Sequence, residues 1–159
     1  MENKIIYKIG DALNTTNNKE TTIITHICND AGGWGAGFVV AISKKWTTPE
    51  KEYRKWYKEK NNFKLGQTQF IKVENNVFVA NMIAQHGYKN YNNPIPIKYE
   101  ALKECLSNVA TYALKNNCII QMPRIGTGLA GGEWCKIEEI INETLIKQGI
   151  KVIVVDLPK

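Results

Sequence analysis

Two short glycine-rich segments constrain the possible fold of this chain more than any other feature of its sequence. Eight of the 12 glycines fall in the first glycine loop (residues 32–37) and the second glycine loop (residues 126–132). Each loop follows an apolar run typical of a buried strand, 21–28 or 118–122, and precedes a helical pattern. That order places both loops at the carboxyl edge of a sheet, where backbone N–H groups lie unpaired beside helix N-termini. Two such loops side by side predict a receptor for a pyrophosphate.

The remaining periodicity predicts an α/β fold. Apolar runs predict strands at 4–9, 21–28, 69–73, 77–83, 118–122 and 151–157. Helical spacing predicts helices at 38–46, 49–60, 97–116 and 133–148. Because helices and apolar strands alternate in the second half, we expect a three-layer α/β/α arrangement around a central mixed, largely parallel sheet. With no repeat or break in composition, residues 1–159 are expected to form one domain.

Composition excludes several classes of protein. The chain has 159 residues, of which 43% are hydrophobic and 23% charged, so it is not a disordered tail, a collagen-like fibre or a repeat array. Its apolar runs are shorter than the roughly 20 residues that span a bilayer, and its first residues lack the apolar stretch of a signal peptide. We therefore expect a cytoplasmic protein that does not associate with membranes, and its small size favours a monomer.

The net charge of +6 invites a nucleic-acid interpretation, which the distribution of charge weakens. Arg54 and Arg124 are the only arginines, and the densest group of lysines, at 51–60, alternates with glutamates as on a solvated helix face. A nucleic-acid-binding module is kept as a third alternative. The four cysteines form no CxxC pair and have no histidine at ligand spacing, so a zinc site is not expected. We expect neither another metal nor a cofactor.

Several polar residues follow the predicted strands. Asp11 stands at a turn after the first strand, where its carboxylate could accept a hydrogen bond from an amine such as that of adenine, or simply close the turn. Asn29 and Asp30 follow the central strand and could hold ribose hydroxyls or position a water, or could open the loop as an Asx-turn. Trp34, between glycines, is hard to explain as a core residue and could wall a sugar pocket.

The two histidines lie in different contexts. His26 is inside an apolar strand, where a hydrogen-bonded core histidine is commoner than a catalyst. His86 precedes Gly87 in a polar, irregular segment, so its imidazole could serve as a general base near neutral pH, or could be an exposed loop histidine.

Taken together, these residues resemble a macrodomain, the ADP-ribose-binding α/β/α fold. The resemblance rests on Gly10-Asp11, on the run 26–37, on the run 122–129 and on Trp134 with the closing strand. It looks closest to the branch that holds the terminal ADP-ribose protein glycohydrolase and the yeast-type ADP-ribose 1″-phosphate phosphatase. The partner implied is ADP-ribose, or a protein or nucleic acid that carries it.

The resemblance also implies roles for single residues. Asp11 would hold the adenine amine, the two glycine loops would cradle the phosphates, and Asn29, Asp30 and Trp34 would surround the distal ribose. The ligand-binding set implied is Asp11, Asn29, Gly33, Trp34, Gly35, Ala36, Gly37, Phe38, Gln85, Ile125, Gly126, Thr127, Gly128, Leu129 and Ala130.

The sequence departs from that branch at two catalytic positions. Gln85 stands where the glycohydrolase has a lysine that forms a covalent intermediate, and an amide cannot form a Schiff base. Ala130 stands where the same enzyme has an aspartate. An enzyme would therefore use Asp30 or His86 as a base, with Asn29 holding the ribose, to hydrolyse an ADP-ribosyl adduct or ADP-ribose 1″-phosphate at the distal ribose C1″. The alternative is a reader that binds ADP-ribose and releases it unchanged.

Overall fold

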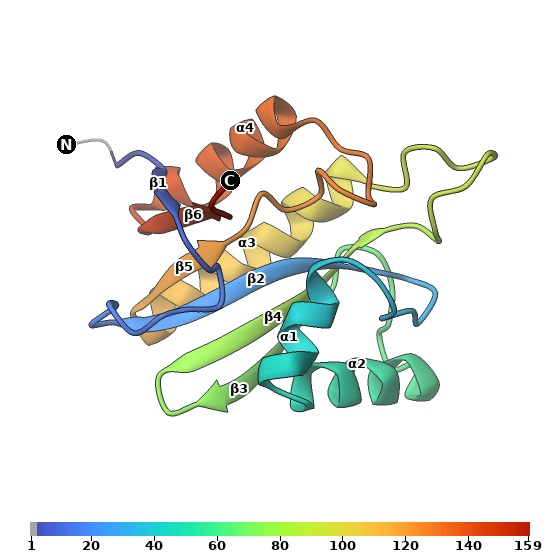
Figure 1. The fold of residues 1–159 in the computed structure, drawn as a ribbon, viewed down its shortest axis with the longest axis horizontal. Coiled ribbons are helices and arrows are strands. Elements are labelled where there is room, and N and C mark those ends of the chain that lie inside the picture. Colours follow the sequence, from blue (N-terminus) through green and yellow to red (C-terminus); the bar gives the residue numbers. More distant parts are fainter. Residues whose placement is uncertain (1–2) are drawn as a thin grey trace.

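The computed structural model describes residues 3–159, which form one six-stranded sheet between two layers of helices (Figure 1). The strand order is β1-β6-β5-β2-β4-β3. All neighbouring strands are parallel except β3 and β4, which form an antiparallel pair. The predicted mixed, largely parallel sheet is therefore confirmed. The strands are β1 (Ile6–Ile9), β2 (Thr21–Asn29), β3 (Thr68–Glu74), β4 (Val77–Gln85), β5 (Cys118–Met122) and β6 (Val152–Asp156).

The helices lie where the periodicity predicts them, with one difference. They are α1 (Phe38–Lys45), α2 (Thr48–Glu59), α3 (Tyr99–Asn116) and α4 (Trp134–Thr144). The prediction of a single helix over 133–148 is wrong in the last turn, because α4 ends at Thr144 and a separate 3-10 turn (Ile146–Gln148) follows. That turn ends at Gly149, whose φ of 80° is left-handed and therefore favours glycine. Within the described part of the chain, no helix is long and apolar enough to cross a bilayer.

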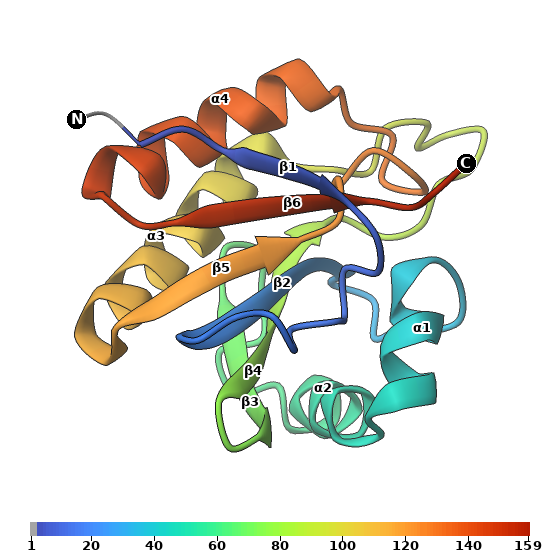
Figure 2. The same ribbon diagram turned by 60° about the vertical axis from the view of Figure 1, so that its left-hand side comes forward.

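Both faces of the sheet are covered, as two views of the ribbon show (Figures 1 and 2). Successive residues of β2 point to opposite faces: Ile23 packs in the cluster that contains Leu102 of α3, and Ile24 packs with Ile42 of α1. The four side chains are fully buried. This double coverage explains why β2 reads as a continuous apolar run, and it leaves the ends of the strands as the places where a ligand can approach.

The two glycine loops leave the sheet side by side. Strands β2 and β5 are parallel neighbours, paired from Thr21↔Cys118 to Ile24↔Gln121, so their carboxyl ends lie at the same edge. The first loop leads into α1 and the second into α4. Neither helix has a capping side chain or an acidic residue in its first turn. The positive end of the α1 dipole therefore has no carboxylate of its own first turn beside it, whereas α4 carries Glu133 at its N-cap position. The predicted placement of the loops is confirmed.

Candidate ligand-binding site

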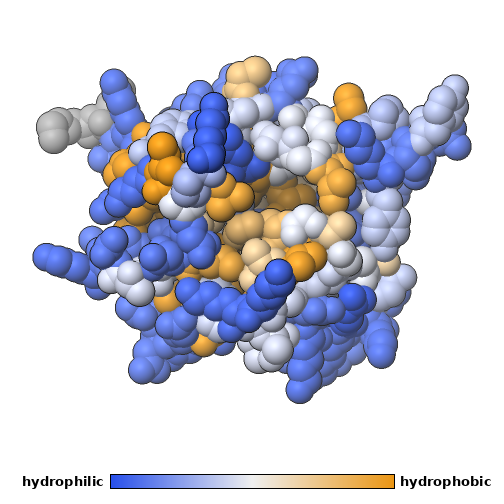
Figure 3. Space-filling model, viewed as in Figure 1, coloured by the Kyte–Doolittle hydropathy of each residue, from blue (hydrophilic) through white to orange (hydrophobic). Residues whose placement is uncertain are grey.

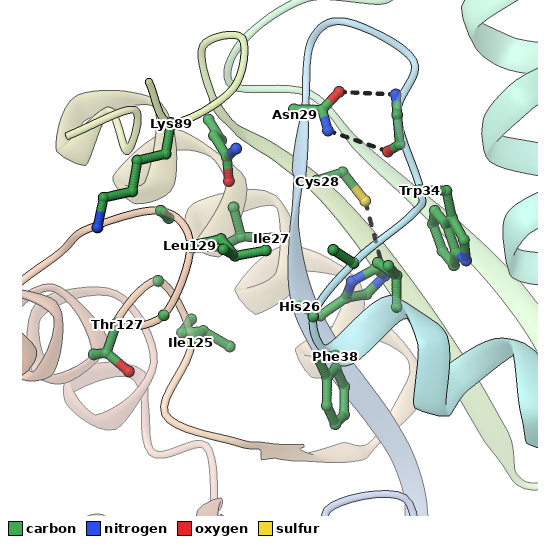
Figure 4. Close-up of a pocket in the computed structure, with 18 of the residues that line it drawn as sticks. His26, Ile27, Cys28, Asn29, Trp34, Phe38, Lys89, Ile125, Thr127 and Leu129 are labelled. Atoms are coloured by element: carbon green, nitrogen blue, oxygen red, sulfur yellow. Dashed lines mark hydrogen bonds between the residues drawn. The ribbon is translucent and has the colours of Figure 1, made fainter. Parts of the chain in front are cut away.

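A pocket of about 570 Å³ lies between the two glycine loops (Figure 4). Its walls come from the end of β2 (26–29), from the first loop with the start of α1 (33–39), and from residues 123–130, which include most of the second loop. Gln85, Tyr88 and Lys89 complete it from the segment that begins at the end of β4. On the face seen in Figure 3, hydrophobic residues gather in a hollow at the middle and hydrophilic ones around it. Every residue of the predicted ligand-binding set lines the pocket except Asp11.

Gly35 and Gly128, in the pocket wall, have no conformational reason to be glycine. They differ in this from Gly37 and Gly126, whose φ values of 89° and 76° favour glycine. Gly35 and Gly128 are not among the residues with positive φ, and a Cβ added at either would meet nothing within 4 Å. The space beside them is the pocket that both line. Their lack of a side chain lets a ligand come close to the backbone there.

Asn29 shapes the first loop through its side chain. Its Oδ1 accepts hydrogen bonds from the N–H of Ala31 (2.9 Å) and of Gly33 (3.0 Å), and its Nδ2 donates to the Gly33 carbonyl (3.1 Å). The hydroxyl of the buried Tyr53 donates to the Asn29 carbonyl and lies 3.0 Å from Oδ1. Burial raises the pKa of Tyr53, so the phenol stays a donor. The Asx-turn interpretation therefore describes Asn29, which also lines the pocket.

Trp34 is a core residue, and the interpretation that excluded it from the core is wrong. Its side chain is 5% exposed, and its indole N–H donates to the Ser43 hydroxyl (2.7 Å). Its ring meets His26 edge-on at 5.3 Å between centroids and packs against Tyr53 at 5.4 Å. Trp34 also belongs to the wall of the pocket.

His26 is the buried histidine that its strand context predicts. It is 2% exposed, and its Nε2 bonds Oδ1 of Asn81. The Asn81 Nδ2 donates to the Pro49 carbonyl and to Gln69, so the oxygen faces His26 and Nε2 must carry the proton. Nδ1 is then a bare acceptor, and it has no partner among residues 3–159. Burial lowers the pKa of His26 to about 4, so the ring is neutral at pH 7.

Cys28 also lines the pocket but is not an activated nucleophile. Its Sγ lies 3.8 Å from Nε2 of His26, the nitrogen that carries the proton and therefore cannot accept one. Burial raises the pKa of the Cys28 thiol well above its ordinary value. The pair therefore lacks the thiolate that nucleophilic cysteines need.

Asp30 and His86 form a hydrogen-bonded pair at the ends of neighbouring strands. His86 Nδ1 lies 2.7 Å from Oδ2 of Asp30, and Oδ1 of Asp30 accepts the N–H of Gly87 at 2.8 Å. Both carboxylate oxygens are engaged, whereas Nε2 of His86 has no recorded partner in the described residues. The preceding residues, Asn29 and Gln85, are paired in the sheet and line the pocket, but Asp30 and His86 do not line it.

Asp11 closes a turn instead of lining the pocket. Its Oδ1 accepts the N–H of Leu13 at 2.9 Å, which is the turn alternative that the sequence left open. Conversely, Tyr88 and Lys89 line the pocket but were not predicted, because the segment between β4 and α3 has no periodicity. The contact of Tyr88 with the first loop explains a glycine in the sequence, because a Cβ added at Gly33 would overlap the Tyr88 ring and hydroxyl. Across residues 3–159, no three His, Cys, Asp or Glu side chains are placed to hold a metal ion.

Comparisons with curated proteins give distant relatives, and no family model matches the chain. The chain is 27% identical over 154 residues to Chromodomain-helicase-DNA-binding protein 1-like of Danio rerio, covering 92% of this chain but only 15% of that protein. It is 25% identical over 126 residues to an ADP-ribose 1″-phosphate phosphatase of Candida albicans, covering 76% of this chain and 80% of the enzyme.

Solved structures give closer relatives. A protein of unknown function from Bacteroides thetaiotaomicron is 51% identical with a TM-score of 0.91, over 96% of this chain and 98% of the other. A macrodomain protein from Streptomyces coelicolor is 44% identical with a TM-score of 0.86, over 96% of this chain and 99% of the other. With that identity over almost the whole of both chains, and with the same fold, the chain belongs to the macrodomain family.

Proposed function

We propose that the pocket binds ADP-ribose, with the diphosphate held between the two glycine loops. The observation that carries the proposal is the pair Gly35 and Gly128. The fold does not require glycine at either position, and the lack of a side chain would let a ligand reach the backbone amides. The uncapped start of α1 adds its dipole. The pocket wall includes Lys89 and Arg124 but no Asp or Glu from the described residues, which suits an anion.

The ligand would lie along the pocket with its distal ribose beside Asn29 and Gln85, and with its adenosine toward Phe38. Figure 4 shows Asn29 and Phe38 at opposite ends of the site. Asp11 is the residue that the family resemblance assigns to the adenine amine. With Oδ1 occupied by the N–H of Leu13, its other oxygen would be the one to accept that bond.

Titration of the protein with ADP-ribose in a calorimeter tests the binding proposal directly. We expect one site per chain, and weaker binding of ADP, which lacks the distal ribose. An absence of heat with ADP-ribose would overturn the proposal, and equal affinity for ADP would place the distal ribose outside the pocket.

We further propose hydrolysis at the distal ribose C1″ of an ADP-ribose derivative. Two curated relatives are named ADP-ribose 1″-phosphate phosphatases, which supports this reaction class. In the proposed step, water attacks C1″ and the C1″–O bond breaks with its electron pair leaving on the departing group. The proton of the water passes to Nε2 of His86. In the neutral ring, Asp30 would accept the Nδ1–H of His86, and the lone pair of Nε2 would then be the one that accepts the proton.

The second candidate function is a reader without turnover. It is favoured by Gln85 and Ala130, which stand where the similar branch of enzymes has its lysine and aspartate. It is also favoured by the position of Asp30 and His86 outside the pocket wall.

Variants of the Asp30–His86 pair separate the two candidates. His86→Gln should reduce release of phosphate or of the ADP-ribosyl group about a hundredfold, the usual contribution of a general base. Asp30→Asn should reduce it less, since an amide can still accept the Gly87 N–H and contact His86. Asp30→Ala should lower turnover further while ADP-ribose binding is retained. Products are followed by mass spectrometry with ADP-ribose 1″-phosphate and with ADP-ribosylated protein.

The outcome for the wild-type protein decides between the functions. Turnover of neither substrate, with ADP-ribose still bound, would identify a reader. Turnover that persists in His86→Gln would show that another group accepts the proton.

A further inference from the structure

Lys89 is a cation at the ligand site whose particular partner the proposed function leaves open. It belongs to the segment between β4 and α3 and lines the pocket. Figure 4 shows its side chain extending toward the ribbon of the second glycine loop, on the side of the site away from Phe38. Tyr88, the residue before Lys89, lies against Gly33, which Asn29 holds by hydrogen bonds. Lys89 therefore lies toward the end that we assign to the distal ribose.

The backbone that carries Lys89 is fixed on both sides. Before it, the N–H of Gly87 donates to Asp30, and the Tyr88 ring packs on Gly33 of the first loop. After it, the side chain of Asn93 donates to the carbonyls of His86 (2.8 Å) and Tyr88 (3.0 Å). The lysine side chain itself is exposed, so its ammonium can move within reach of a ligand while its root stays in place.

The charge of Lys89 is not compensated by the protein. Its ammonium forms no ion pair with any carboxylate of residues 3–159. Arg124, the other cation in the pocket wall, is held by Asp156 through two hydrogen bonds of 2.7 and 3.1 Å. The positive charge left over at the site therefore lies on Lys89, away from the Phe38 end.

We propose that Lys89 binds a phosphate group on the distal ribose, so that the site prefers an ADP-ribose derivative with a terminal phosphate monoester over ADP-ribose itself. The inference rests on the proposed binding of ADP-ribose, in which backbone amides of the two loops hold the diphosphate. A phosphate monoester carries between one and two further negative charges near pH 7, whereas an ester of ADP-ribose with a protein carboxyl group carries none at that bond. Lysine is a common point-charge partner for phosphate.

The test compares two ligands on two matched lysine variants. Affinities for ADP-ribose and ADP-ribose 1″-phosphate are measured by stopped-flow competition against a fluorescent ADP-ribose probe, so that the reading precedes turnover. The wild-type protein should bind the 1″-phosphate about tenfold more tightly, the effect of one charge-assisted contact. Lys89→Met should lower the affinity for the 1″-phosphate about tenfold more than the affinity for ADP-ribose. Lys89→Arg should keep most of the preference.

The control is Lys72→Met, on the exposed side of the edge strand β3 and outside the pocket, which should leave both affinities unchanged. The preference should also shrink at high salt, because Lys89 is exposed. A wild-type protein without preference, or an equal loss for both ligands in Lys89→Met, would overturn the assignment of Lys89. Failure of the wild-type protein to bind either ligand would instead overturn the proposed function.

Discussion

Valine in place of Gly35 or of Gly128 should abolish ADP-ribose binding, with an affinity loss of a thousandfold or more, and leave stability within about 0.5 kcal/mol of the wild-type value. Neither residue has a positive φ, and a Cβ at either meets no protein atom within 4 Å, so the folded chain accepts the side chain. The branched side chain would occupy the place where a phosphate oxygen must meet the backbone amides. Losing two charge-assisted hydrogen bonds or more accounts for an effect of this size.

Gly149→Ala is the matched control, and it should show the opposite pattern. Gly149 has φ of 80° at the end of the 3-10 turn and does not line the pocket. Alanine there should cost about 1 kcal/mol of stability and leave ADP-ribose affinity unchanged. Binding is read by calorimetry and stability by the urea midpoint. If Gly35→Val binds ADP-ribose normally, the first loop does not hold the diphosphate.

The position of this site could be predicted because its signals are local in sequence. The order of buried strand, glycine loop and helix occurs twice, over residues 21–45 and 118–144, and it determines the edge of the sheet at which each loop emerges. Only the adjacency of β2 and β5 had to be assumed, and the register from Thr21↔Cys118 onward confirms it. The ligand-binding set was implied by the family resemblance, which rests largely on these two loops, and all of it except Asp11 lines the cavity.

The roles of single side chains depend on contacts between distant residues, which a local pattern does not contain. Asp30 meets His86 across 56 positions, and Tyr88 packs on Gly33 from a segment without periodicity. Trp34 illustrates the same limit. Its two flanking glycines suggest an exposed side chain, but the indole packs under the loop against His26 and Tyr53. Side-chain direction in a loop follows from each residue's own φ and ψ, so it appears only with the fold.

Acidification should destabilise the protein through His26. The pKa of His26 is about 4 in the folded protein and about 6.5 in an unfolded chain, so the ring is neutral in both states above pH 6.5. Between pH 6.5 and 4 the unfolded chain binds a proton that the folded protein does not. The free energy of unfolding therefore falls as the pH falls, by about 2 kcal/mol at pH 5 and about 3 kcal/mol at pH 4.

The measurement is the urea midpoint from pH 7 to pH 5, and the decisive variant is His26→Gln. Glutamine keeps an N–H donor for Asn81 but does not titrate, so the variant should be less stable at pH 7 and lose most of the slope. His86→Gln, in the exposed histidine, retains His26 and should retain the slope. The carboxylates with lowered pKa values, Glu50 and Asp156, titrate below the range chosen. A His26→Gln variant with an unchanged slope would mean that the folded protein accepts a proton on Nδ1, the atom left without a partner beside the pocket.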